Sequence, residues 1–148
     1  MSLLDDDLVS IPVYYTYADN KYGSKRLAIL DDEKATKMME NEKEKSTLQV
    51  LNTQWKNLSW SEQNTMMKVC EKPNAPGELP SFDWSLFQDQ RVKNCLKSWD
   101  MKTDDGKPIP VSSDNIDRLP NTIVRDLLDK FDAVTQIGDE ETGKSSTQ

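Results

Sequence analysis

Clusters of carboxylates are the side chains in this sequence that most resemble a chemical site. They occur in four groups, at residues 5–7, 31–33, 104–105 and 139–141. Glycoside hydrolysis needs two carboxylates in one cleft, with the pKa of one of them raised. These groups lie instead at predicted chain ends, helix starts and turns, where carboxylates are solvated or cap a helix. They therefore predict no catalytic pair.

The stretch that begins at Asp100 has some features of a calcium-binding loop. An EF-hand loop needs oxygen ligands at alternating positions, a glycine at the sixth position and a glutamate at the twelfth. Counted from Asp100, the third, sixth and twelfth positions hold Lys102, Asp105 and Val111, so the pattern fails. A β-turn explains the Asp-Asp-Gly-Lys sequence better.

Histidine is absent from the chain, which removes the commonest general base and the commonest transition-metal ligand. The two cysteines, Cys70 and Cys95, fall on predicted apolar helix faces. We expect them to be reduced core thiols, with a disulfide or a redox role as the alternative. The sequence has neither a nucleophile elbow nor a glycine-rich phosphate loop. It therefore predicts a protein that is not an enzyme, holds no metal or cofactor, and acts by binding other proteins.

The overall charge narrows the class of partner. The 148 residues carry a formal net charge of -7, which argues against non-specific binding to nucleic acid or to anionic membranes. No apolar run approaches the roughly 20 residues that span a bilayer. The acidic N-terminus also lacks the basic-then-apolar order of a signal peptide. We expect a cytoplasmic protein that is neither secreted nor transmembrane.

Residues 1–30 are predicted to form a short β-hairpin. The run Leu8–Tyr17 is β-branched and aromatic, and its Pro12 suggests an edge or the start of a strand. Turn residues follow at 18–24, and Arg26–Leu30 is the expected return strand, with a helix over Leu27–Leu30 as the alternative.

Helices are predicted for most of the remaining chain. Residues 33–57 contain no glycine or proline, and apolar residues at helical spacing from Leu48 to Leu58 predict one long helix, or two that meet near residues 46–47. Asp31 or Asp32 is the expected cap. A helix to about Glu71 is expected to open with a Ser59-x-x-Glu62 capping box, and a loop follows over 72–80. The next helix runs from Ser81 or Asp83 to about Ser98, and an irregular hairpin or an extended loop covers 99–111. The last elements are a helical turn from Ser112 or Ser113 to Leu119 and an amphipathic helix over 122–137.

The expected fold class is mainly α (α+β), a single small helical domain with a short N-terminal hairpin. Residues 1–30 form the hairpin region, 31–137 the helical domain and 138–148 a disordered acidic tail. Gly138 is expected to end the last helix. The predicted core comprises Leu51, Trp55, Leu58, Trp60, Met67, Val92, Leu96, Trp99, Ile116, Leu119, Val124, Leu127 and Phe131.

A protein-binding surface is expected from adaptable and aromatic side chains. Methionines are soft contacts, and tryptophans dominate interface hot spots, although the alternative for the tryptophans is a place in the core. The charged stretch 31–45 is either a solvated helix or a segment that orders on a partner. The candidate binding residues are Met38, Met39, Leu48, Leu51, Trp55, Trp60 and Trp84.

Two segments, Gln54–Asn64 and Arg91–Pro120, carry a family resemblance. A predicted helix ends in Ser-Trp-Asp at 98–100, an Asp-Gly-Lys-Pro turn follows at 105–108, and an Ile-Asp-Arg-Leu-Pro segment at 116–120 precedes the last helix. This arrangement resembles the tail assembly chaperones of long-tailed bacteriophages over roughly residues 50–135. The first 30 residues do not share in the resemblance.

The resemblance implies a function in virion assembly. Such chaperones bind the tape measure protein and help tail-tube subunits to polymerise around it, in the cytoplasm of the infected bacterial host, and are typically absent from the finished virion. Homo-oligomerisation is left open. Two other classes remain as alternatives: a structural head–tail connector or minor virion protein, and an acidic, DNA-mimicking inhibitor of a host defence protein. The lysines interspersed among the acidic residues make the mimic less suitable.

Overall fold

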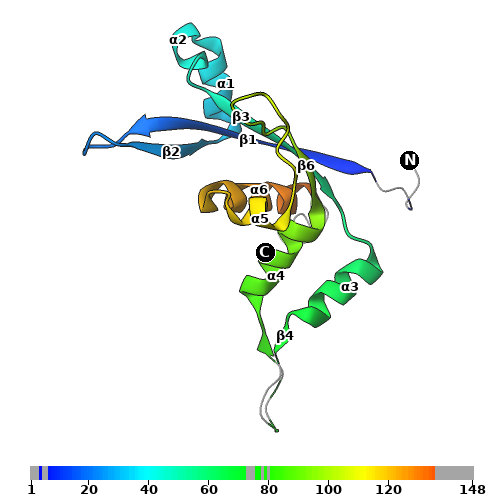
Figure 1. Ribbon diagram of the computed structural model, residues 1–148. Helices are drawn as coiled ribbons and strands as arrows, with labels where there is room; N and C mark the ends of the chain where they lie inside the picture. Colours follow the sequence, from blue (N-terminus) through cyan, green and yellow to red (C-terminus); the bar gives the residue numbers. More distant parts are fainter. Residues whose placement is uncertain (1–3, 5–6, 73–75, 78, 80, 136–148) are drawn as a thin grey trace, which may run out of the picture.

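A four-stranded antiparallel sheet forms the centre of the molecule (Figure 1). The computed structural model describes residues 4, 7–72, 76–77, 79 and 81–135. The strand order is β2-β1-β3-β6. The strands are β1 (Leu8–Asp19), β2 (Lys25–Leu30), β3 (Gln49–Lys56) and β6 (Leu96–Trp99).

The predicted hairpin is confirmed. β1 and β2 pair antiparallel from Tyr14 opposite Leu30 to Asp19 opposite Lys25. At the turn, the Asn20 side chain accepts hydrogen bonds from the backbone N–H groups of Tyr22 and Ser24, and Gly23 has a φ of 81° that favours glycine.

β1 extends past the end of β2, and Pro12 lies in this part of the strand. Pairing with β2 begins only at Tyr14, so β2 offers no ladder partner there. Lys130 Nζ donates a 2.7 Å hydrogen bond to the Pro12 carbonyl and thereby satisfies an acceptor in this segment. A proline is tolerated at position 12 because β2 does not reach this residue and so needs no backbone N–H from it.

The prediction of a long helix over 33–57 is wrong for its second half. Residues 49–56 form β3, a central strand that pairs with β1 along its whole length and with β6 on the other side. Leu51, Thr53 and Trp55 are buried and the residues between them are more exposed, which is the period of a strand. The Thr53 hydroxyl donates to the Ile11 carbonyl (2.7 Å) and accepts from Trp55 Nε1 (2.8 Å). Because Thr53 is polar, the apolar positions that remain, Leu48, Leu51, Trp55 and Leu58, have the spacing of a helix, which is why the sequence predicts one.

The expected helix to Ser98 also ends early. α4 spans Trp84–Cys95, and Leu96–Trp99 continue as strand β6. The prediction of a mainly α domain is therefore wrong: the fold is α+β, built on the sheet. Strand partners distant in sequence override the local helical preference of both segments.

The Ser98-Trp99-Asp100 motif joins β6 to its neighbours. Asp100 accepts hydrogen bonds from the backbone N–H and the side-chain amide of Asn52, at 3.0 and 2.8 Å. Trp99 Nε1 donates to the Ile109 carbonyl (2.6 Å). The expected irregular hairpin follows, with a bridge between Lys102 and Pro108 and a turn at Gly106, whose φ is 84°. The residues that carry the family resemblance thus have structural roles here.

α6 (Asn121–Thr135) crosses one face of the sheet (Figure 1). It buries Ile123, Leu127, Leu128 and Phe131, and the Phe131 ring stacks on Trp55 with centroids 4.9 Å apart. Two short helices rise on the side away from α6, namely α1 (Asp32–Glu40), capped by Asp31 as expected, and α2 (Glu42–Lys45). The predicted helical turn near 112–119 is α5 (Ser113–Asp117).

The predicted core is largely confirmed, with two errors. The buried members are Leu51, Trp55, Val92, Leu96, Ile116, Leu127 and Phe131, while Leu58, Trp99 and Val124 are partly buried against them and Leu119 is half-buried. Trp60 and Met67 are instead exposed, by 84% and 38%. Cys70 and Cys95 are buried and free, as expected. Residues 136–148, which include Gly138 and the predicted disordered tail, lie outside the described part of the chain.

Candidate protein-binding surfaces

A projecting arm extends from the sheet (Figure 1). It consists of α3 (Trp60–Val69), β4 (Glu71–Lys72), β5 (Ser81–Phe82) and the first turn of α4, and we call these elements the arm. The capping box predicted at Ser59 is present: Ser59 Oγ accepts from the Glu62 N–H, and the Glu62 carboxylate accepts from the Ser59 N–H. β4 and β5 pair antiparallel, with the Asp83 N–H bonded to the Cys70 carbonyl at 2.8 Å.

Exposed apolar side chains concentrate on the arm. Of the twelve large hydrophobic residues that are exposed in the described part of the chain, four belong to it, and a fifth, Leu79, lies in the connection between β4 and β5. The four are Trp60, Met67, Val69 and Trp84. Because single exposed hydrophobic residues are ordinary but a gathering of them marks an interaction surface, the arm is the first candidate site.

An aromatic cluster orders the outer end of the arm. Phe82, Trp84 and Phe87 lie with ring centroids 4.6 to 5.7 Å apart in edge-on and tilted arrangements. Asp83 caps α4 by accepting a hydrogen bond from the Leu86 N–H (3.0 Å). Trp84 is therefore held by its neighbours while two thirds of it (67%) remains exposed, so little side-chain entropy is lost when a partner covers it.

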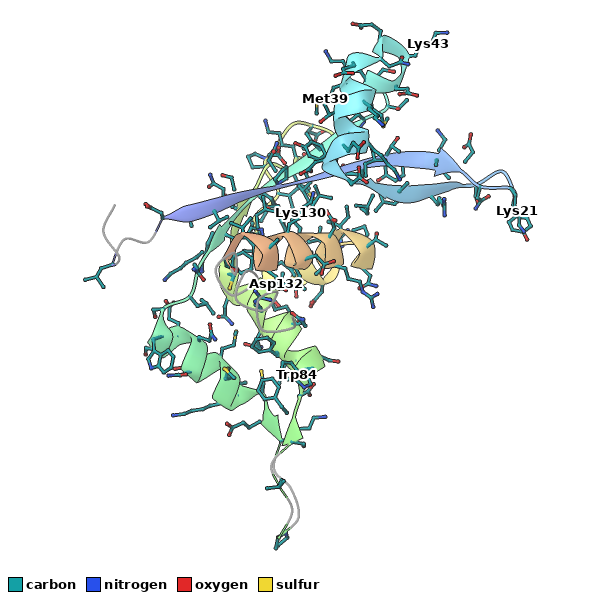
Figure 2. All side chains as sticks on the ribbon, turned by 180° about the vertical axis from the view of Figure 1, so that it is seen from behind. Lys21, Met39, Lys43, Trp84, Lys130 and Asp132 are labelled. Carbon is teal, nitrogen blue, oxygen red and sulfur yellow. The ribbon has the colours of Figure 1, made fainter. Side chains whose placement is uncertain are left out.

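The seven candidate binding residues do not form one surface. Trp60 and Trp84 are on the arm and exposed, whereas Leu51 and Trp55 lie in the core and contribute to no surface. Met38 and Leu48 are half-buried and Met39 is exposed. Figure 2 shows Met39 and Trp84 at opposite ends of the molecule. Of these seven residues, only Trp60 and Trp84 lie on the arm, where Trp60 begins α3 and Trp84 begins α4.

A second candidate is a groove of about 750 Å³ between α4, α5 and α6. Its floor is apolar, with buried Val92, Ile116 and Leu128 beside half-buried Leu119 and Val124. Its charged lining consists of Asp89, Asp117, Asp129, Asp132 and Arg125. These residues come from three helices, and none was singled out as a binding residue because no local spacing connects them.

The carboxylates of the groove are more exposed than the cations that pair with them. Lys93 Nζ lies 3.1 Å from an Asp89 oxygen and 3.0 Å from an Asp117 oxygen, and hydrogen bonds to Asp117 and then Asp89 raise the pKa of Lys93. The Lys93 side chain is 23% exposed and that of Asp117 57%. Arg91 pairs with Asp132 in the same manner, with the arginine the more buried partner.

The shifted pKa values of the cysteines and of Glu62 have structural causes. Burial raises the pKa of the Cys95 thiol to about 11 and also raises that of Cys70, so both stay protonated near neutral pH. Hydrogen bonds from the Ser59 backbone and Lys56 lower the pKa of Glu62 to about 2, which reflects its capping role. Among the described residues, no group of three or more Cys, Asp or Glu side chains is placed to hold a metal ion.

Compared with models of known protein families, with curated proteins and with solved structures, the chain gives no significant match. Within the described part of the chain, the helices are all too short or too polar to cross a membrane.

Proposed function

We propose that this protein is a tail assembly chaperone of a long-tailed bacteriophage, which binds the tape measure protein and promotes assembly of the tail tube around it. The proposal starts from the resemblance of residues 50–135 to that family. It places the protein in the cytoplasm of the infected cell and gives it a binding function without catalysis.

The observation that carries the proposal is the exposed apolar surface of the arm. A chaperone for a long helical client needs apolar surface that covers client side chains in place of water. The arm presents Trp60 and Trp84 from two helices that the capping box and the β4–β5 pair hold in position. Large aromatic side chains on a rigid support are the usual anchors of protein interfaces.

A shallow hollow beside the arm extends this surface. It has a volume of about 330 Å³ between α3 and α4, with Leu58, Met66 and Val69 among its apolar lining and Glu62 and Lys97 at its polar positions. In this mechanism, client helices lay apolar side chains across the arm and into the hollow. Tail-tube subunits then compete for the same client surface and release the chaperone.

The test is co-expression of this protein with the tape measure and tail-tube proteins from its own genome, followed by measurement of soluble co-purification. We expect the tape measure protein to be insoluble alone and soluble in a complex with this chain. The double variant W60S/W84S should lose most of that solubilisation. The matched control Y17S/Y22S removes two exposed aromatic residues from the hairpin and should retain it.

Other outcomes would replace the proposal. Absence of a complex, together with this protein in purified virions, would indicate a head–tail connector; absence from both would favour an inhibitor of host defence. Equal loss in both double variants would contradict the role of the arm. Deletion of residues 33–58 is not a suitable test, because it removes β3 and Trp55 and so dismantles the sheet.

A further inference from the structure

We infer that the groove between α4, α5 and α6 binds a cationic amphipathic helix of a partner protein. This surface shares only Ser85 with the arm and is lined by neither Trp60 nor Trp84, so the inference goes beyond the proposed function and does not depend on it. Its basis is the combination of an apolar floor, a rim of carboxylates and walls built from three helices and the short segment that joins two of them.

The size and floor of the groove suit the apolar side of a helix. The groove has a volume of about 750 Å³. Leu119, in the connection between α5 and α6, and Val124, in α6, are half-buried, and Val92 and Leu128 are buried. Apolar side chains at helical spacing would cover Leu119 and Val124 and remove them from water.

The charge of the rim selects a cationic partner. Four aspartates line the groove against one arginine, Arg125. When the inner cations Arg91 and Lys93 are included, carboxylates still exceed cations by four to three. Asp89 and Asp117 share the single ammonium of Lys93, and the cations are less exposed than their partners, so an approaching helix meets carboxylates first.

The walls favour a helix over an extended strand. A strand needs a sheet edge for its backbone hydrogen bonds, and the groove residues come from α4, α5, α6 and the segment between the last two. A helix satisfies its own backbone groups and needs only side-chain contacts. Long lysine and arginine side chains can then cover apolar surface while their charges reach the rim.

Segments of this chain itself are poor occupants. Residues 5–7 and 139–141 are acidic, and a second copy brings a net charge of -7. Both would place carboxylates against carboxylates, which is unfavourable. The occupant is therefore a different protein.

The experiment uses the full chain and a synthetic peptide of leucine and lysine, about 18 residues or five helical turns long, ordered to form an amphipathic helix. Controls are the same peptide with glutamate for lysine, and a peptide of identical composition with leucine and lysine strictly alternating. Affinities are measured by fluorescence anisotropy at moderate salt. We expect the helical lysine peptide to bind about tenfold or more tightly than either control.

Variants locate the binding. D117N/D129N should weaken binding about fivefold, because two exposed carboxylates are neutralised. D104N/D105N makes the same charge change in the exposed turn before Gly106 and should leave the affinity unchanged. Gln88 is an exposed lining residue, so Q88W should block the groove and abolish binding. Circular dichroism of each variant checks that the fold is retained.

Three results would overturn the inference: no preference for the helical lysine peptide, equal weakening by the two double aspartate variants, or normal binding by folded Q88W. The arm variant W60S/W84S should bind the peptide as the parent does. A chain that binds the peptide but fails to solubilise the tape measure protein would therefore refute the proposed function and leave this inference standing.

Discussion

The sheet with α6 and the arm use tryptophan in opposite ways. In the sheet, Trp55 is fully buried, stacks on Phe131 and donates its N–H to Thr53. On the arm, Trp60 and Trp84 are mostly exposed, and Trp84 packs edge-on against Phe82 and Phe87. Tryptophan therefore stabilises the core in the sheet and is available to a partner on the arm. The surroundings of each side chain, not its type, determine which role it has.

The largest expected effect comes from Trp55 itself. W55A should lower the free energy of unfolding by about 3–5 kcal/mol, because it leaves a cavity against Phe131 and removes the N–H that donates to the Thr53 hydroxyl. W60A, the matched control on the arm, should change it by no more than about 0.5 kcal/mol. Urea denaturation followed by circular dichroism measures both. Similar losses in the two variants would remove the distinction between the regions.

The buried hydroxyl of Thr53 is the second test. T53V keeps the shape of the side chain but leaves the Ile11 carbonyl and the Trp55 N–H without this partner, so we expect a loss of about 1–3 kcal/mol. T65V removes a hydroxyl that bonds the Ser61 carbonyl on exposed α3 and should be nearly neutral. Denaturation of the pair side by side is the measurement. A neutral T53V would mean that the hydrogen bonds of Thr53 contribute little to the sheet.

A smaller and local effect is expected on the arm. W84A removes ring contacts with Phe82 and Phe87, which are together worth about 0.5–1.5 kcal/mol. Hydrogen exchange should quicken at the Asp83 amide, which bonds the Cys70 carbonyl, while the amides of β3 keep their rates. Equal acceleration in both regions would show that the arm and the sheet unfold as one unit.

The smallest expected effect is a loss of arm stability at acid pH. The pKa of Glu62 is lowered to about 2 in the folded chain from an ordinary value of 4.5, chiefly by the Ser59 backbone N–H. Since the folded pKa is the lower one, the stabilisation is present above pH 4.5 and is lost as the pH falls towards 2. E62Q should therefore show a smaller fall in thermal stability over this range than the parent. Parallel pH profiles would contradict the role of this carboxylate.

The sequence by itself determined the elements that are stabilised by residues close together in the chain. The β-branched and aromatic run of β1, the Asn20–Gly23 turn and the Ser59–Glu62 capping box could all be predicted, because they depend on residue types and hydrogen bonds close together in the chain. The amphipathic helix α6 was predicted from its pattern of four buried apolar residues. Most of the core followed from the same patterns.

Tertiary structure alone decided β3, β6 and both candidate surfaces. Thr53 is polar in the sequence but buried in the fold, since a carbonyl 42 residues away accepts its hydroxyl. The groove needs three helices brought together, and Trp60 is exposed although its sequence context predicted a core residue. Burial, strand pairing and the assembly of a groove are properties of contacts between distant segments. A single sequence records the residues that can make such contacts but not which partners they meet.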